Sequence, residues 1–234
     1  MTGQADAPGD GSSSSVEVEL KFDVDDDTPL PDWTELPGVA SVSGPEPRQL
    51  DARYFDTGDL ALAHAGYALR RRTGGPDEGW HIKGPREGHG RTERHWPLGD
   101  DETLPAAVRD AVRAIVPEGT DASLSPLARI RNARTAYHLR DADGGVLAEF
   151  VDDHVIATDE RRGAEPGADP GGERSGGEPG AERRWREWEL ELGSAAPADP
   201  DEVAAFFAAA QRAVTAAGAR PAASDSKLAR TLGF

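Results

Sequence analysis

The chain has 234 residues, no cysteine and a formal net charge of −17, with 26 lysine and arginine residues against 43 aspartates and glutamates. This charge argues against a general binder of nucleic acids or anionic membranes, and no apolar run approaches the roughly 20 residues of a transmembrane helix. The absence of cysteine excludes disulfides and thiolate metal sites and fits a cytoplasmic protein. We expect one domain, over residues 16–234.

Residues 1–15 predict a disordered tail, because they contain neither the basic nor the apolar region of a secretory signal. The next stretch, Val16–Phe22, alternates strictly, with apolar side chains on one face of a strand and Glu17, Glu19 and Lys21 on the other. A single strand of this kind most often turns its charged face to water. The same alternation returns in later segments, which favours a functional charged surface.

Two elements with little chemistry follow. Leu30–Val39 contains two prolines and predicts a short helix or turn, and Arg48–Asp56 predicts a strand. The strand Tyr67–Arg72 then places Arg70 and Arg72 on one face. A solvated basic run is the common explanation of such a triplet, but two arginines on one face also suit a forked clamp on phosphate.

Gly74–Asp77 predicts a hairpin turn, and the returning strand Gly79–Lys83 brings Lys83 to the same basic surface. A further strand covers Arg91–Leu98. Several short strands without an intervening long helix favour an antiparallel sheet or barrel. Thr103–Val116 has helical apolar periodicity and predicts a packing helix with Pro105 in its first turn.

The second half of the chain repeats the charged alternation. Leu127–Leu139 predicts a strand with Arg134 on its polar face, and Val146–Asp153 a strand that places Glu149 and Asp153 on one face. A glutamate inside so apolar a strand invites a functional explanation, because carboxylates are seldom buried without a partner.

Residues 159–183 contain almost no large apolar side chains, which predicts a flexible loop. Trp185–Leu192 then alternates tryptophan and leucine with glutamate, and its acidic face consists of Glu187, Glu189 and Glu191. A helix is expected from the cap at Asp199 to the stop at Gly218. Lys227 follows, and it is one of only three lysines in the sequence.

About eight strand candidates, each with one charged face, predict an α+β protein with an eight-stranded antiparallel barrel, flanking helices and charged residues in the barrel interior. Enclosed charges of both signs require partners. A polyphosphate bound by arginine and lysine, with a divalent cation bridging it to carboxylates, meets both requirements. An open sheet with its charged face in solvent remains the alternative.

An ordered set of motifs resembles the CYTH superfamily, also called triphosphate tunnel metalloenzymes, over roughly Val16–Leu232. These motifs are Glu17-x-Glu19-x-Lys21, Tyr54–Thr57, Leu69–Arg72, Trp80–Lys83, Arg91–Glu93, Arg134, Ala148–Asp153, Glu187–Glu191 and Ser226–Lys227. Glu-x-Glu-x-Lys alone arises by chance in amphipathic strands, but nine motifs in order are specific.

The resemblance implies an eight-stranded tunnel that cleaves or cyclises triphosphate compounds with Mg²⁺ or Mn²⁺. The metal would be held by Glu17, Glu19, Glu149, Asp153, Glu189 and Glu191. The triphosphate would be bound by Lys21, Arg70, Arg72, Lys83, Arg134 and Lys227. Catalysis would depend on Glu17, Glu19, Lys21 and Lys227.

Three assignments keep alternatives. Asp152 competes with Asp153, which is preferred because it shares the strand face of Glu149. Arg129 or Arg131 would replace Arg134 if the strand register slipped. Arg91, Glu93 and Glu187 also have interior parity, and for each of them a role in the site and a charge-balancing or surface role are both open. His81, His95 and His138 are expected to satisfy local hydrogen bonds, because Mg²⁺ favours oxygen ligands.

The expected function is hydrolysis of inorganic triphosphate or a similar compact triphosphate. A class IV-type adenylate cyclase and a thiamine triphosphatase are alternatives within the fold, and both need an organic-group pocket that the sequence does not identify. A non-catalytic polyphosphate- or nucleotide-binding module would not need both acidic pairs. A monomer or homodimer acting on a small-molecule triphosphate is expected.

Overall fold

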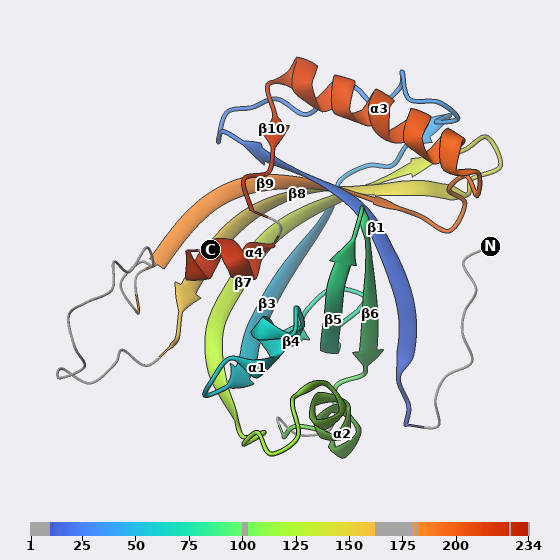
Figure 1. Cartoon of the computed structure of the whole chain (residues 1–234). Helices are drawn as coiled ribbons and strands as arrows, with labels where there is room; N and C mark the ends of the chain where they lie inside the picture. Colours follow the sequence, from blue (N-terminus) through green and yellow to red (C-terminus); the bar gives the residue numbers. More distant parts are fainter. Residues whose placement is uncertain (1–9, 100–102, 162–179, 181, 225, 234) are drawn as a thin grey trace.

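The computed structural model describes residues 10–99, 103–161, 180, 182–224 and 226–233, and a single curved sheet dominates this part of the chain (Figure 1). The strands are β1 (Ser13–Val24), β2 (Ser41–Val42), β3 (Glu46–Thr57), β4 (Ala68–Thr73), β5 (Gly79–Glu87), β6 (Gly90–Trp96), β7 (Leu124–Arg140), β8 (Val146–Asp159), β9 (Glu182–Leu192) and β10 (Arg220–Pro221). The helices are α1 (Ala61–His64), α2 (Ala106–Ile115), α3 (Pro200–Ala217) and α4 (Lys227–Leu232).

The sheet closes into an antiparallel barrel of eight strands. Their order is β1-β6-β5-β4-β3-β7-β8-β9, and β9 pairs with β1 again. β1 closes the barrel because its first half, from Ser13 to Val18, pairs with β6, whereas its second half, from Glu19 to Val24, pairs with β9. The two-residue strands β2 and β10 pair with β7 and β1. The predicted fold class is therefore confirmed.

The outward faces of two groups of strands, β1 with β8 and β9 and β4 with β5 and β6, carry apolar residues that pack against helices. In Figure 1, α3 crosses the outer side of β1, β8 and β9, and in the largest core cluster Phe206 of α3 joins Phe150 and Trp188 from these strands. On the other side, Val108 and Val112 of α2 share a cluster with residues of β4, β5 and β6. Burial of each such side chain contributes about 1.5–3 kcal/mol, which directs the charged parity into the barrel.

The barrel interior is not charged along its whole length. Where β3, β7 and β8 approach α4, interior positions carry apolar residues, among them Ile130 and Val155, which pack with Leu232 of α4. This end of the barrel is thus filled by a small core. The charged motifs occupy the remaining interior.

Element boundaries differ from the predictions in several places. β1 begins at Ser13, so the last residues of the predicted tail pair with β6, and residues 1–9 lie outside the described part. The predicted packing helix is shorter, because α2 begins only after Pro105. The helix predicted from Asp199 is confirmed, with the Asp199 side chain accepting a hydrogen bond from Asp201 N and Gly218 (φ 107°) as C-cap.

The predicted flexible loop falls mostly on residues 162–179 and 181, which lie outside the described ranges. The strands on either side reach further than expected, with β8 ending at Asp159 and β9 starting at Glu182. Leu30–Val39 forms turns, as one of its two predicted forms, and α4 was not predicted as a helix. Within the described ranges, no helix is both long enough and apolar enough to cross a bilayer.

Candidate active site

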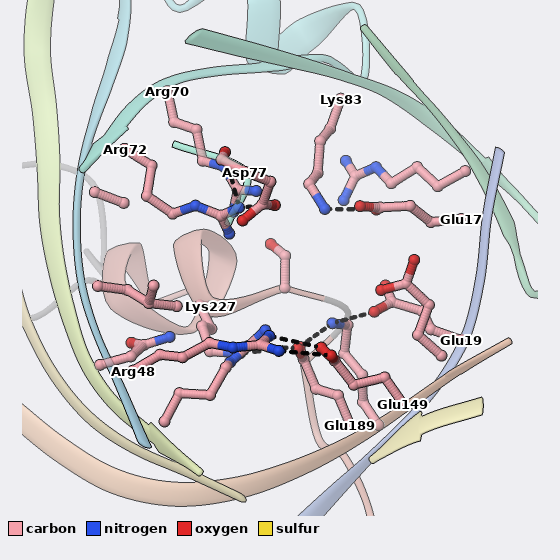
Figure 2. Close-up of a pocket in the computed structure, with 18 of the residues that line it drawn as sticks. Glu17, Glu19, Arg48, Arg70, Arg72, Asp77, Lys83, Glu149, Glu189 and Lys227 are labelled. Carbon is pink, nitrogen blue, oxygen red and sulfur yellow. Dashed lines mark hydrogen bonds and ion pairs between the residues drawn. The ribbon is translucent and has the colours of Figure 1, made fainter. Parts of the chain in front are cut away.

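The barrel encloses a cavity of about 440 Å³, and Figure 2 shows charged side chains projecting into it from all sides. The cavity contains all three lysines of the sequence. Its charged lining residues are Glu17, Glu19, Lys21, Arg48, Arg70, Arg72, Asp77, Lys83, Arg91, Arg134, Glu149, Glu189, Glu191 and Lys227. Every predicted site residue therefore lines the cavity except Asp153, which is fully buried directly behind it.

The two signs of charge come largely from different halves of the barrel. The lining glutamates lie on β1, β8 and β9, which are neighbours, whereas the lining arginines and Lys83 lie on β3 to β7. Glu19, Glu191 and Glu149 are directly opposite one another across β1, β9 and β8. Like charges at opposed positions destabilise a sheet, so this row creates a local demand for a cation.

Cations of the chain meet this demand only in part. Lys21 Nζ lies 2.9 Å and Arg86 Nη2 3.0 Å from Glu19, and Lys83 Nζ lies 2.5 Å from Glu17. Within the described residues, no hydrogen bond or ion pair reaches Glu191. Burial, together with the negative charges of Glu17 and Glu19, raises the pKa of Glu191 to about 8. Burial and the nearby Glu93 also raise the pKa of Glu17.

A second acidic cluster surrounds Lys227. Carboxylate oxygens of Asp153, Glu187 and Glu189 lie within 4.8 Å of one another. Lys227 Nζ lies among them, 3.0 Å from Asp153, 2.5 Å from Glu187 and 2.9 Å from Glu189. Burial acts to lower the pKa of Lys227, but these three carboxylates outweigh it and hold that pKa well above its ordinary value. An ammonium group thus already fills this cluster.

The start of α4 places Lys227 there. Ser226 caps the helix, and its Oγ accepts a hydrogen bond from Ala229 N at 3.0 Å. Lys227 is consequently the first helical residue, at the point where α4 meets the barrel interior. The helix that closes one end of the barrel therefore also supplies a cation to the cavity.

Arg134 is the arginine of β7 that lines the cavity. It donates to Asp153 from Nε (2.8 Å) and Nη2 (2.6 Å), and to Glu189 at 2.9 Å. Arg129 and Arg131 point outward, where they pair with other residues at the exposed surface. The register of β7 therefore settles the sequence alternative in favour of Arg134.

Parity likewise separates Asp152 from Asp153. Asp152 lies on the outer face, where its carboxylate accepts from Arg186 at 2.8 and 2.9 Å and from the Trp188 indole at 3.1 Å. Arg186 also donates to three main-chain carbonyls of the segment 25–28. Asp152 is thus part of a structural network, whereas Asp153 faces inward and contacts Arg134 and Lys227 of the cavity lining.

The basic half contains Arg70 and Arg72 side by side on β4 (Figure 2). Burial, with the positive charges of Arg70 and Arg134 nearby, lowers the pKa of Arg72 to about 9. A lowered arginine pKa signifies an excess of positive charge, and the group remains protonated at neutral pH. Glu93, whose pKa is lowered to about 2 despite burial, balances Arg70 at 3.4 Å and Lys83 at 3.6 Å.

His81, His95 and His138 make local contacts, as predicted. His81 Nδ1 lies 2.6 Å from Glu93, and His138 Nε2 lies 3.0 Å from Glu149. Burial and the positive charges of Arg70 and Arg72 lower the pKa of His81.

Three charged residues escaped prediction from the sequence: two line the cavity, and the third contacts one of its glutamates. Arg48 donates two hydrogen bonds to Glu149, each of 3.0 Å. It lies on β3, whose other interior residues are mostly apolar and gave no indication of a charged site. Arg86 reaches Glu19 from the end of β5, beyond the predicted strand. Asp77 belongs to a turn, for which strand parity makes no prediction.

A closed antiparallel barrel that encloses a cavity lined by charges of both signs is a tunnel-type fold. The chain belongs to the CYTH domain family, whose sequence model matches residues 15–216. An uncharacterized protein of Mycobacterium tuberculosis, MT2285 in strain CDC 1551 and Rv2226 in strain H37Rv, is 41% identical over 218 residues. That match covers 91% of this chain but 39% of the relative, so the chain spans about two fifths of the relative's length.

Solved structures share the fold at low identity. A candidate adenylate cyclase (bh2851) from Bacillus halodurans has a TM-score of 0.52 and 16% identity, over 93% of this chain and 97% of that one. HpAC1 from Hippeastrum, a candidate adenylyl cyclase described as having a dominant triphosphatase activity, is 16% identical with a TM-score of 0.48, over 92% and 94% of the two chains. The first likeness supports the fold alone, and the second is too low to carry an argument.

Proposed function

We propose that this domain hydrolyses inorganic triphosphate, or a similarly compact triphosphate, in a reaction that depends on a divalent metal ion. The observation that carries the proposal is the division of one enclosed cavity into a carboxylate half and an arginine and lysine half. A polyanion together with a divalent cation neutralises both halves at once, which neither ligand does alone.

The basic half has the composition that a triphosphate requires. Arg70 and Arg72 offer planar guanidinium groups for bidentate contacts to phosphate oxygens, and Lys83 offers a point charge beside them. Arg134 on β7, Lys21 on β1 and Lys227 on α4 also line the cavity, and each of them is paired with carboxylates. A bound triphosphate would share these three cations with their carboxylates.

The carboxylate half fits a hard divalent cation. Its donors are all oxygens, and Glu191 is a partly buried carboxylate without an ion-pair partner among the described residues. We assign Mg²⁺ or Mn²⁺ to Glu17, Glu19 and Glu191, next to Glu149. Asp153 and Glu189 are also candidate ligands, but an ion bound to them would have to take the place of Lys227.

Such an ion would neutralise phosphate oxygens and lower the pKa of an attacking water. The residues of the chain bind and orient the triphosphate and stabilise the charge that spreads over the transferred phosphoryl group, which is the main source of catalysis in phosphoryl transfer. In this proposal Lys21 and Lys227 act together with Arg70 and Arg72, so cations surround the reacting phosphate. The enclosing barrel limits access of other water.

The test measures phosphate release from inorganic triphosphate, ATP and thiamine triphosphate with Mg²⁺, Mn²⁺ or EDTA. We expect metal-dependent release from inorganic triphosphate that falls at least about 100-fold in Glu19→Gln and in Arg72→Ala. Arg129→Ala serves as a matched control, because Arg129 lies on the barrel wall but points outward. Its activity should equal that of the wild type.

The same assay distinguishes the alternatives. Formation of pyrophosphate and a cyclic nucleotide from ATP would identify a cyclase, and preferential turnover of thiamine triphosphate would identify an organic triphosphatase. Binding of triphosphate without turnover of any substrate would indicate a binding module. Equal loss of activity in Arg129→Ala would contradict a role of the cavity residues in particular.

A further inference from the structure

The turn between β4 and β5 folds over the cavity, and Pro76 and Asp77 form part of the lining. Gly74 (φ 78°) and Gly75 (φ 80°) have left-handed backbone conformations, and a Cβ on Gly74 would lie 2.0 Å from Gln49 O. The turn is therefore packed closely against β3. This close packing fixes where Asp77 enters the cavity.

Asp77 makes two separable sets of contacts. Its main-chain oxygen accepts from His81 Nε2 at 3.0 Å and from Arg72 Nη2 at 3.3 Å, which anchors the turn. Its carboxylate forms an ion pair with Arg72 (Figure 2). The Asp77 side chain is 57% exposed, whereas that of Arg72 is 7% exposed. The carboxylate can consequently leave Arg72 while the main chain of the turn stays anchored.

Arg72 has no other partner among the described residues: its hydrogen bond and its ion pair both go to Asp77, and its buried Nε has no acceptor. The other cavity cations differ, since Arg70, Lys83 and Arg134 are paired with buried glutamates or aspartates of the barrel wall. Arg72 is thus neutralised by the one carboxylate that comes from a turn and reaches solvent.

We propose that Asp77 is a specificity-determining residue that occupies the anion position at Arg72 and has to be displaced when the substrate binds. This inference rests on the proposed function. Any anion that uses Arg72 must replace the Asp77 carboxylate. A triphosphate offsets that replacement by contacting several further cations, whereas orthophosphate contacts few. Asp77 therefore disfavours small anions, including the released product, and favours polyanions.

The test is calorimetric binding of inorganic triphosphate and of orthophosphate in EDTA, to the full chain and to Asp77→Asn. Glu78→Gln is the matched control, because it changes the charge equally in the same turn, where Glu78 accepts from Gly74 N, but Glu78 does not line the cavity. Removal of a half-exposed competing carboxylate should increase the binding affinity for both ligands by about fivefold relative to Glu78→Gln. The fold gain for orthophosphate should exceed that for triphosphate, and equal gains would overturn the role of Asp77 in specificity.

Thermal unfolding in EDTA gives an independent readout. Without ligand, Asp77→Asn should melt below Glu78→Gln, because Arg72 loses its anion. With triphosphate, Asp77→Asn should show the larger rise in Tm. Equal or weaker triphosphate binding by Asp77→Asn than by Glu78→Gln would overturn the role of Asp77 even if the wild type hydrolyses triphosphate. Absence of both binding and turnover in the wild type would instead overturn the proposed function itself.

Discussion

Glu19 on β1 and Glu191 on β9 lie directly opposite each other in the wall of the barrel. Glu19 has Lys21 and Arg86 as partners, whereas Glu191 has none among the described residues. The strand pairing that closes the barrel is thus also what forces two carboxylates together. The repulsion between these carboxylates carries an electrostatic penalty at this point, and several measurable consequences depend on it.

The first prediction concerns pH and stability without metal. Burial and neighbouring glutamates raise the pKa of Glu191 from 4.5 to about 8 in the folded protein. Between pH 4.5 and pH 8 the folded protein keeps a proton that the unfolded chain has lost. The contribution of protonated Glu191 to stability is therefore full below pH 4.5, falls as the pH rises, and is lost once the pH has passed 8. In EDTA at pH 9, Glu191→Gln should therefore melt a few degrees above the wild type.

At pH 4 the two proteins should melt at the same temperature, because Glu191 is then protonated in both states. Glu182→Gln, at an exposed position of the same strand, should show no such pH dependence. A variant Glu191→Gln that melts below the wild type at pH 9 would show that the Glu191 carboxylate is paired.

The second prediction concerns the effect of a bound metal ion on thermal stability. Mg²⁺ or Mn²⁺ should raise the Tm of the wild type in the absence of substrate, because the ion binds the folded state and relieves repulsion among the glutamates. Glu191→Gln and Glu19→Gln should lose most of this rise, whereas Glu182→Gln should keep it. An unchanged metal-induced shift in both cavity variants would place the metal elsewhere.

The third prediction separates neighbouring aspartates of β8. Asp152→Asn weakens the outer network with Arg186 and Trp188 and should lower the free energy of unfolding by about 1–3 kcal/mol. Triphosphate binding measured by calorimetry should not change, because Asp152 faces away from the cavity. A large loss of affinity in this variant, at a temperature where it is folded, would contradict the assigned parity.

Alternation in the sequence predicted most of the fold and most of the cavity for a physical reason. β1 and β9 pack one face on α3, so burial fixes their parity and sends Glu19 and Glu189 inward. The same argument fails on β3, because its interior face carries Leu50 and Ala52 beside Arg48. The regularly spaced polar residues of β3 therefore lie on the outer face of the barrel. The apolar end of the interior is the end at which α4 packs. This tertiary contact leaves no periodic pattern in the local sequence, so the sequence does not predict it.

The cluster around Lys227 provides the last prediction. Lys227→Met leaves Asp153, Glu187 and Glu189 buried without their shared ammonium, which should lower the free energy of unfolding in EDTA by about 3–5 kcal/mol. Mg²⁺ should then restore more stability to this variant than it adds to the wild type, because the three carboxylate oxygens lie close enough together to hold an ion. Chemical denaturation with and without Mg²⁺ measures both effects. Arg230→Met, in the same helix but paired with Asp23 away from this cluster, controls for loosening of α4. If Lys227→Met were as stable as the wild type in EDTA, the carboxylates would have to be protonated or neutralised by other cations, and Lys227 would not be the ion that the cluster requires.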